Sequence, residues 1–250
     1  MKVSIITATY NSASTVADTL ESVKVQTYGN IEHIVVDGLS KDNTLELVQA
    51  SSHVSKVISE KDNGIYDAMN KGIALTNGDI IGILNSDDFF AHENVVKEVV
   101  ELFETTGCDA VYGNLIFVHP ENPKKILRKW IAGGYDVKLF LKGWMPPHPT
   151  FFVRKSVYNQ LGTFNTSLKS SADYELLLRF LYMHKIKVEY LHDVLVHMRS
   201  GGQSTKSFSN RIKAHKEDYL AWRLNNLTPK WYTLMLKPVR KIKQFLFPRI

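Results

Sequence analysis

Residues 79–90 read DIIGILNSDDFF, an apolar run that leads into two acidic and two aromatic residues. Residues 80–84 are apolar without the alternation of a half-buried strand, which is typical of a strand covered on both faces in a parallel sheet. Two adjacent carboxylates, Asp87 and Asp88, follow directly. A helical pattern begins at Val95 and extends to Phe103. The stretch therefore predicts a strand over 79–85 that delivers acidic side chains to its carboxyl end.

The same strand-then-helix unit recurs upstream. Its predicted strands cover residues 3–9, 31–37 and 54–59, and its predicted helices cover about 13–27, a short segment from 43, and 65–76. Strands that alternate with helices of this length favour an α/β fold: a mostly parallel central sheet with helices on both faces.

The pattern changes after about residue 108. We expect a long strand or pair over 110–118, a helix over 172–184, a strand over 188–196, and two C-terminal helices joined near Thr228-Pro229. The predicted organisation is a domain over 1–205, with halves 1–107 and 108–205, followed by a helical segment over 206–250.

Charge and cysteine content narrow the class of protein. The chain has 31 basic and 25 acidic residues, but residues 230–250 contain six basic residues and no acidic one. The remaining body is neutral, which argues against nucleic acid as a partner. Cys108 is the one cysteine, so no internal disulfide can form, as in a reducing compartment. Neither a signal peptide nor an apolar run long enough for a membrane span is present, and we expect a cytoplasmic protein.

The basic C-terminal segment mixes its cations with apolar side chains. Such a segment can lie in a membrane interface, where anionic lipids attract its basic residues. We therefore expect a peripheral protein on the inner face of the cytoplasmic membrane, with a kink or break at Pro238. In the alternative, the segment packs on the body and buries five apolar residues: Leu236, Ile242, Phe245, Leu246 and Phe247.

Polar residues follow all four predicted strands of the first half. These segments are residues 7–11, 37–40, 60–64 and 85–88. Each alone is explained by turns and helix caps, for which Asp and Asn are common. Together they lie at the edge of the sheet where α/β proteins bind ligands. Clustered carboxylates repel unless a cation compensates, so Asp87 and Asp88 predict an Mn²⁺ or Mg²⁺ site that would also hold phosphates.

Four motifs in this order resemble the family 2 glycosyltransferases, in particular those that build bacterial exopolysaccharide, capsule and O-antigen. The motifs are VSIITATYN, VVDGLSKDNT, DNGIYDAMNKGI and LNSDD. The resemblance covers roughly residues 1–205 and implies a GT-A fold, a divalent metal and a single displacement that inverts the anomeric carbon.

The resemblance also implies site residues. Thr7, Tyr10 and Asn11 would line the base pocket, Asp37 and Asp62 would reach the base and ribose, and Asp87 and Asp88 occupy the family's metal-binding DxD position. The chain departs from the commoner pattern at Gly38, where many members have a second acid. It departs again at Asn85, where the motif usually opens with Asp and where an amide would act as a neutral partner.

The catalytic base is expected from the second half. A carboxylate that removes the proton of the acceptor hydroxyl accelerates displacement. Asp173, at the start of the predicted helix over 172–184, resembles the family's acid at this place, with Glu175 as second choice. The alternative is that Asp173 only complements the helix dipole.

Four further residues have open alternatives. By resemblance, His197 is a candidate third metal ligand, and the alternative is an ordinary histidine at a strand end. Arg199, beside the glycine-rich loop over 200–204, is a candidate for the diphosphate. Lys71 is a candidate for the diphosphate or a solvated helix lysine, and His148, in a proline-rich loop, is placed near the acceptor.

The sequence therefore predicts an inverting hexosyl- or N-acetylhexosaminyltransferase. It would move a sugar from a nucleotide-diphosphate sugar, with UDP-sugar as first candidate, to a saccharide acceptor that is polyprenyl-linked. One rival is a metal-dependent nucleotidyltransferase, although the basic, glycine-rich phosphate loop expected near its N-terminus is missing from ITATYNSAST. The other is a non-catalytic module that binds sugar or nucleic acid.

Overall fold

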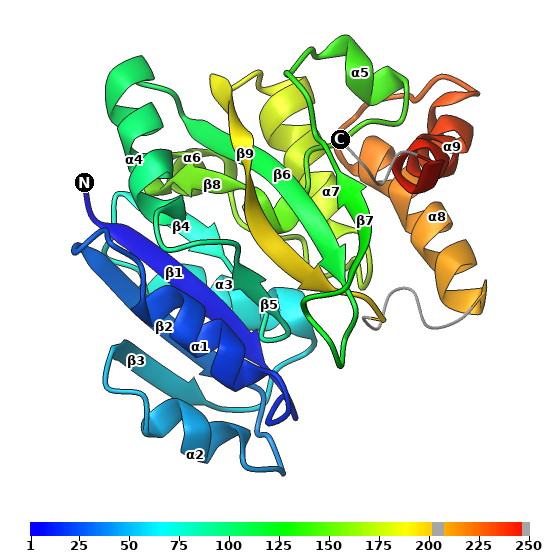
Figure 1. Cartoon of the computed structure of the whole chain (residues 1–250). Helices are drawn as coiled ribbons and strands as arrows, with labels where there is room; N and C mark the ends of the chain where they lie inside the picture. The colour runs from blue at the N-terminus through cyan, green and yellow to red at the C-terminus, as the bar shows by residue number, and fades with distance from the viewer. Residues whose placement is uncertain (202–207, 247–250) are drawn as a thin grey trace.

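The fold is built on one mixed sheet. The computed structural model describes residues 1–201 and 208–246. Within these ranges nine strands pair in the order β3-β2-β1-β4-β8-β6-β9-β5, and β7 pairs with β6 at the side (Figure 1). The strands are β1 (Val3–Thr9), β2 (Ile31–Asp37), β3 (Val54–Ser59), β4 (Ile80–Ile83), β5 (Asp88–Phe90), β6 (Ala110–Val118), β7 (Ile126–Trp130), β8 (Phe152–Arg154) and β9 (Val188–Arg199).

The sheet is mostly parallel, as predicted. β3, β2, β1 and β4 are parallel neighbours, and β6 and β9 are parallel to each other. β8 is antiparallel to both β4 and β6, so all six of these strands run in one direction. The short strands β5, β7 and β8 run the other way. The polar loops after β1, β2, β3 and β4 therefore share one edge.

Helices cover both faces of the sheet. They are α1 (Val16–Lys24), α2 (Thr44–Gln49), α3 (Ile65–Leu75), α4 (Val95–Thr106), α5 (Lys138–Leu141), α6 (Lys155–Leu161), α7 (Ala172–Leu177), α8 (Phe208–Leu224) and α9 (Thr233–Leu246), with a 3-10 turn η1 (His148–Thr150) and a π-helical turn η2 (Leu178–Met183). The apolar stripes of α1, α2 and α4 pack on one face, and those of α3, α6, α7 and α8 pack on the other.

Three features differ from the predicted elements. β5 and β7 were not predicted, because strands of three and five residues give little local signal and form through pairing with β9 and β6. The predicted helix over 172–184 has the expected extent, but its second half is π-helical, with His184 N–H donating to the Arg179 carbonyl at 3.0 Å. α9 runs through Pro238 without interruption.

The C-terminal helices pack against the second half of the sheet. Trp222 of α8 is fully buried and donates its indole N–H to the Tyr174 hydroxyl at 2.9 Å. Lys237 of α9 pairs with Asp218 of α8 at 2.7 Å and lies over the Tyr174 ring. No helix within the described residues is long and apolar enough to cross a membrane.

Gly143 lies in close contact with the backbone of α9. Its φ is +71°, and a Cβ there would lie 2.5 Å from the Lys237 backbone nitrogen. We expect Gly143→Ala to lower the free energy of unfolding by about 2 kcal/mol, because left-handed backbone and overpacking each cost roughly 1–2 kcal/mol for an L-residue. Urea denaturation measures this.

The matched control is Gly134→Ala. A Cβ at Gly134 would meet nothing within 4 Å, so this variant should stay within about 0.5 kcal/mol of the parent chain. Equal stability of the two variants would mean that α9 does not hold this position in solution.

Candidate active site

Asp37 lies at the centre of the polar edge. It ends β2, where it pairs in register with Thr9 of β1 and Ser59 of β3. Its fully buried carboxylate accepts hydrogen bonds from the Thr9 hydroxyl at 3.0 Å, the Ser59 hydroxyl at 2.7 Å, the Ser40 N–H at 3.0 Å and the Ser40 hydroxyl. Burial alone would raise the pKa of Asp37, but these four bonds outweigh it and hold the pKa below its ordinary value. Asp37 is therefore an ionised anchor beneath the edge.

The three residues expected at a base pocket lie at the end of β1 and in the segment after it. Thr7 is fully buried and its hydroxyl lies 3.0 Å from Nε2 of His33, so its side chain is inside the sheet layer. Asn11 adopts a left-handed φ of 49° and ties the loop to its neighbour, donating its N–H to the Ser40 hydroxyl at 2.9 Å and accepting from the Lys41 N–H at 2.8 Å. Tyr10 is 55% exposed. Thr7 is thus enclosed, whereas Tyr10 and Asn11 are both exposed and can offer side chains to a ligand.

Gly38, Asp62 and Tyr10 form a compact group next to Asp37. A Cβ at Gly38 would overlap Oδ2 of Asp62 and lie 3.4 Å from Cδ2 of Tyr10. The Asp62 carboxylate thus fills the space that the missing second acid after β2 would take. Its Oδ1 is fixed by the Gly64 N–H at 2.9 Å. The departure at Gly38 is coupled to this position of Asp62.

Lys71 stabilises the loop that carries Asp62. Its ammonium donates to the Lys61 carbonyl at 2.7 Å and pairs with Glu60 at 2.8 Å and with Asp67 at 3.8 Å. The hydrogen bond to Glu60 is the main cause of its raised pKa. Every one of these contacts is to the loop or to its own helix α3.

The turn over 85–88 is bound to α1 and the loop before it. The Thr15 hydroxyl donates to the Ser86 carbonyl at 2.9 Å, the Thr19 hydroxyl donates to the Asp88 carbonyl at 2.7 Å, and the Ser12 and Ser86 hydroxyls lie 2.8 Å apart. These contacts hold the acidic turn at the same edge as Asp37.

Asp87 and Asp88 differ in exposure. Asp88 is fully buried, and accepts from the Asn85 amide at 2.9 Å and the Arg199 N–H at 3.3 Å. Burial and the neighbouring charge of Asp87 raise the pKa of Asp88 well above its ordinary value, against the effect of Asn85 and Arg199. A cation would relieve this accumulation of negative charge, and carboxylate oxygens suit Mg²⁺ and Mn²⁺, so the residues fit a divalent metal. Asp87, which is half-buried, is the carboxylate that faces solvent more.

Arg199 contacts this turn, and His197 lies two residues before it on β9. The Arg199 guanidinium donates to the Asp87 carbonyl at 2.9 Å, pairs with Asp18 and lies 5.1 Å from the Phe89 ring centre. His197 pairs with Phe89 in the β5–β9 ladder, so its side chain lies on the opposite face of that ladder from Asp88. Burial and the neighbouring His92 lower the pKa of His197.

A second group of titratable residues lies near His197. His92, Glu98 and Asp193 have ligand atoms within 4.8 Å of one another. His92 already contacts Asp193 at 3.1 Å through Nε2 and accepts from the Asn94 N–H at 3.3 Å through Nδ1. Both ring nitrogens are therefore engaged within the protein.

Asp173 lies in the first turn of α7. The Tyr66 hydroxyl, from the first turn of α3, donates to Oδ1 of Asp173 at 3.1 Å. Phe164 stacks on Tyr66 and also contacts the His148 ring, at centroid distances of 5.5 and 5.4 Å. His148 is buried, and burial lowers its pKa although Asp173 opposes this. Tyr66, Phe164 and His148 thus form an aromatic wall beside the Asp173 carboxylate.

Glu175, the second choice for the base, is engaged elsewhere. It is buried, pairs with Arg179 at 3.0 Å and accepts from the Asn225 amide at 3.0 Å. Arg179 in turn donates to the carbonyls of residues 161–163. Glu175 is therefore part of a structural network.

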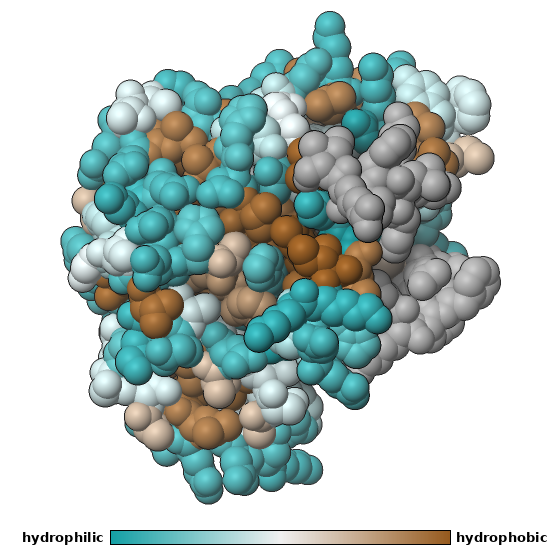
Figure 2. Space-filling model, viewed as in Figure 1, coloured by the Kyte–Doolittle hydropathy of each residue, from teal (hydrophilic) through white to brown (hydrophobic). Residues whose placement is uncertain are grey.

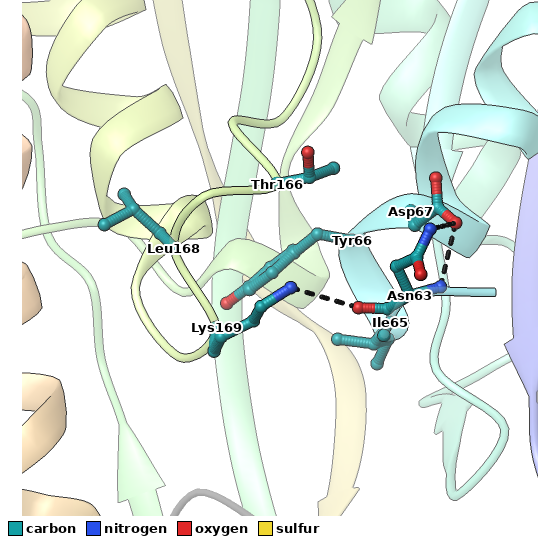
Figure 3. Close-up of a pocket in the computed structure, with 8 residues that line it drawn as sticks. Asn63, Ile65, Tyr66, Asp67, Thr166, Leu168 and Lys169 are labelled. Atoms are coloured by element: carbon teal, nitrogen blue, oxygen red, sulfur yellow. Dashed lines mark hydrogen bonds between the residues drawn. The ribbon is translucent and has the colours of Figure 1, made fainter.

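A small pocket joins the two halves of the site. Residues 63–67 line one side, and Thr166, Leu168 and Lys169 line the other. Figure 3 shows the Tyr66 ring between these segments and the Lys169 ammonium directed at the Asn63 carbonyl, to which it donates at 3.2 Å. The loop that carries Asp62 and the segment before Asp173 are thus in direct contact.

Tyr66, Gly38 and the hydroxyls on α1 were not predicted as site residues. The motif DNGIYDAMNKGI contains Tyr66, and this is the signal that could have identified it. Residues 202–204 of the predicted glycine-rich loop lie outside the described residues.

Comparison with known proteins assigns the chain to a family. The family model described as Glycosyl transferase family 2 matches residues 4–167. An uncharacterized glycosyltransferase of Mycobacterium tuberculosis is 32% identical over 194 residues, which is 71% of this chain and 68% of that protein. A PGL/p-HBAD biosynthesis glycosyltransferase of Mycobacterium bovis is 28% identical over 219 residues, or 84% and 83% of the two chains.

Solved structures agree on the fold. TarS of S. aureus in complex with UDP-GlcNAc superposes with a TM-score of 0.71 at 19% identity, covering 100% of this chain and 74% of that one. The mannosyltransferase PcManGT of Pyrobaculum calidifontis, in complex with GDP-Man and Mn²⁺, superposes with a TM-score of 0.66 at 18% identity, covering 98% and 69%. The chain belongs to glycosyl transferase family 2 and is a glycosyltransferase, and the predicted GT-A fold is confirmed.

Asp37→Asn tests the anchor under this edge. An amide has one acceptor oxygen where the carboxylate serves four donors, so we expect a loss of about 2 kcal/mol in the free energy of unfolding at pH 7. The folded pKa of Asp37 is lowered, so its stabilisation is present above the ordinary aspartate pKa of about 4 and is lost as pH falls through the folded value. Urea denaturation should therefore show the gap between parent and variant narrowing as pH falls below about 4.

Ser59→Ala is the matched comparison, because it removes one donor and keeps the charge. It should cost about 1 kcal/mol and leave the pH dependence in place. A gap that stays constant between pH 7 and pH 3 for Asp37→Asn would contradict the ionised anchor.

Proposed function

We propose that the chain transfers one sugar from a nucleoside-diphosphate sugar to a hydroxyl of a lipid-linked saccharide, with inversion, in surface polysaccharide or glycolipid assembly. The carrying observation is that Tyr66, which lines the small pocket, donates a hydrogen bond to the half-buried carboxylate of Asp173. Glu175 is committed to Arg179, so Asp173 is the acid of this helix that is left for an acceptor. One positioned base is what a single displacement needs.

The donor is placed at the edge around Asp37. The exposed ring of Tyr10 provides a face for a base, and Asp62, next to it, provides a carboxylate for ribose or base hydrogen bonds. Structural neighbours bound to UDP-GlcNAc and GDP-Man support a nucleotide sugar, and a UDP-sugar remains the first candidate. We assign the transferred sugar to the hexoses or the N-acetylhexosamines.

Divalent metal belongs to this proposal. Asp87 would hold Mn²⁺ or Mg²⁺, with Asp88 and Asn85 fixing the turn beneath it, and the neighbour bound to Mn²⁺ supports this ion. When bound, the ion neutralises the departing diphosphate. Arg199 shapes the turn through the Asp87 carbonyl, and His197 is not among the ligands we propose.

The two halves of the domain are given separate tasks. Residues 1–107 would bind the donor, residues 108–205 would bind the acceptor, and residues 206–250 would complete the second half. The relative that is named for PGL/p-HBAD biosynthesis supports a lipid-linked acceptor.

The test is a transfer assay with separate binding measurements. We expect release of nucleoside diphosphate, which excludes the nucleotidyltransferase alternative, since that activity releases pyrophosphate. Asp173→Asn should lower transfer by roughly 10²–10⁴-fold and leave donor affinity within about threefold, because a base acts on the acceptor. Asp87→Asn should instead remove the dependence of donor binding on Mn²⁺.

Asp136→Asn is the control for Asp173, because Asp136 is also an acid near the start of a helix, where it accepts a hydrogen bond from the Lys138 N–H of α5 at 2.9 Å. It should retain full transfer. Asp173→Asn with more than about a third of parental activity would remove the base assignment, and transfer that is undiminished in EDTA would remove the metal.

Membrane association is assigned to α9 and the turn before it. Trp231, Met235 and Val239 are 83%, 61% and 49% exposed. Met235 and Val239 are four residues apart on one side of α9, and Trp231 lies in the turn before the helix. The segment over 230–250 has six cations and no acid. The structure packs Thr233 and Leu234 against the body, leaves Leu236 half-buried, and describes neither Phe247 nor the side chains of Ile242, Phe245 and Leu246. One side of α9 is thus bound to the body, and the exposed side is the one we assign to a cytoplasmic membrane surface.

Co-sedimentation with vesicles tests this assignment. The full chain should bind vesicles with about a third anionic lipid at low salt, and binding should weaken as salt rises, because screening weakens the attraction to cations. Replacing Trp231 and Met235 together by Ser should reduce binding about tenfold or more and leave transfer to a water-soluble acceptor unchanged. Leu127→Ser, an exposed apolar residue of β7, is the control. No binding to anionic vesicles at low salt would end the membrane assignment.

A further inference from the structure

Three consecutive backbone N–H groups converge on one carboxylate just before Asp173. Lys169, Ser170 and Ser171 donate to Oε2 of Glu217 at 3.1, 2.7 and 3.1 Å, and Lys169 also contacts Oε1 at 3.2 Å. Glu217 comes from α8, 44 residues after Asp173 along the chain. Such a row of N–H groups binds an anion strongly, and here the anion is a side chain of the protein itself.

The clamped segment leads directly into the turn that carries the proposed base. The Ser171 carbonyl accepts the first helical bond of α7, from the Glu175 N–H at 2.9 Å, and the Ser171 hydroxyl donates to the Ala214 carbonyl of α8 at 3.2 Å. Any shift of residues 169–171 therefore changes the start of α7 and the position of the Asp173 carboxylate.

Asp173 is thus restrained from two sides. Tyr66 fixes its carboxylate from α3, and Glu217 fixes the preceding backbone from α8. The two restraints come from segments on either side of Asp173 in the sequence, and only Tyr66 lies within the residues that the family model matches. The neighbouring Asp218 pairs with Lys237 at 2.7 Å, points to α9 and does not contact residues 169–171.

We propose that Glu217 is a positioning residue for transfer, which holds the Asp173 carboxylate at the acceptor hydroxyl by fixing residues 169–171. This inference rests on the proposed role of Asp173 as the base. It gives α8 a task in the reaction, beyond the packing of Trp222 that stabilises the domain. A displacement of about 1 Å at a reacting group lowers rates by up to about 10²-fold, which sets the size of the effect.

The experiment uses Glu217→Ala and Glu217→Gln in the full chain, with kcat for transfer and donor affinity measured separately. We expect kcat to fall about 10- to 100-fold in Glu217→Ala and by a smaller factor in Glu217→Gln, which keeps one acceptor oxygen. Donor affinity should stay within about twofold. Asp218→Asn is the matched control: it breaks the ion pair between α8 and α9, so it should lower Tm, but kcat should stay within about threefold.

A double variant separates positioning from general stability. If Glu217 acts through Asp173, Glu217→Ala should cost little further activity in the Asp173→Asn background, because the group it positions is gone. Additive losses in the double variant, or equal losses of kcat in Glu217→Ala and Asp218→Asn, would overturn the proposal. Normal transfer in Asp173→Asn would instead remove the base assignment, so the two failures are distinguishable.

Discussion

The order of the polar edge depends on one buried carboxylate. Asp37 joins the ends of three adjacent parallel strands through hydroxyl groups on β1 and β3 and through the backbone after β2. A buried charge is costly unless it is fully hydrogen-bonded, so the four donors must hold their places while it is ionised. The loops that start at these strand ends are fixed in turn. The group of Tyr10, Gly38 and Asp62 lies in these loops, next to Asp37.

Sequence patterns predicted the first half of the fold well, because apolar runs and helical periodicity are local signals. β1, β2, β3 and β6 begin and end at the predicted residues, and α3 ends one residue early. β5 and β7 could not be predicted in this way. They are too short to show a pattern of their own, and they form because they pair with β9 and β6. The π-helical turn after α7 was also missed, because an apolar stripe does not distinguish i→i+4 from i→i+5 bonding.

The sequence predicted which motifs contribute to the candidate site, but it did not predict the contacts that their side chains make. The motifs placed Asp37, Asp62 and Asp87 at one edge of the sheet, where the structure has them, and the contact of Asp173 with Tyr66 was not predicted. Motifs do not give the direction of a side chain: His197 lies within β9, and its side chain is on the opposite face of the β5–β9 ladder from that of Asp88. Gly38 is informative only with Asp62 beside it, a pairing across 24 residues that no local pattern contains.

The dependence of residues 169–171 on α8 has a consequence for how the chain acquires its final order during synthesis. Domains fold from the N-terminus as the chain emerges, and the sheet is complete once β9 ends at Arg199. At that stage the three N–H groups of residues 169–171 still lack the carboxylate to which they donate in the full structure, and water must satisfy them. In the nascent chain, the polar edge around Asp37 would therefore form before α8 emerges. The start of α7 would become ordered last.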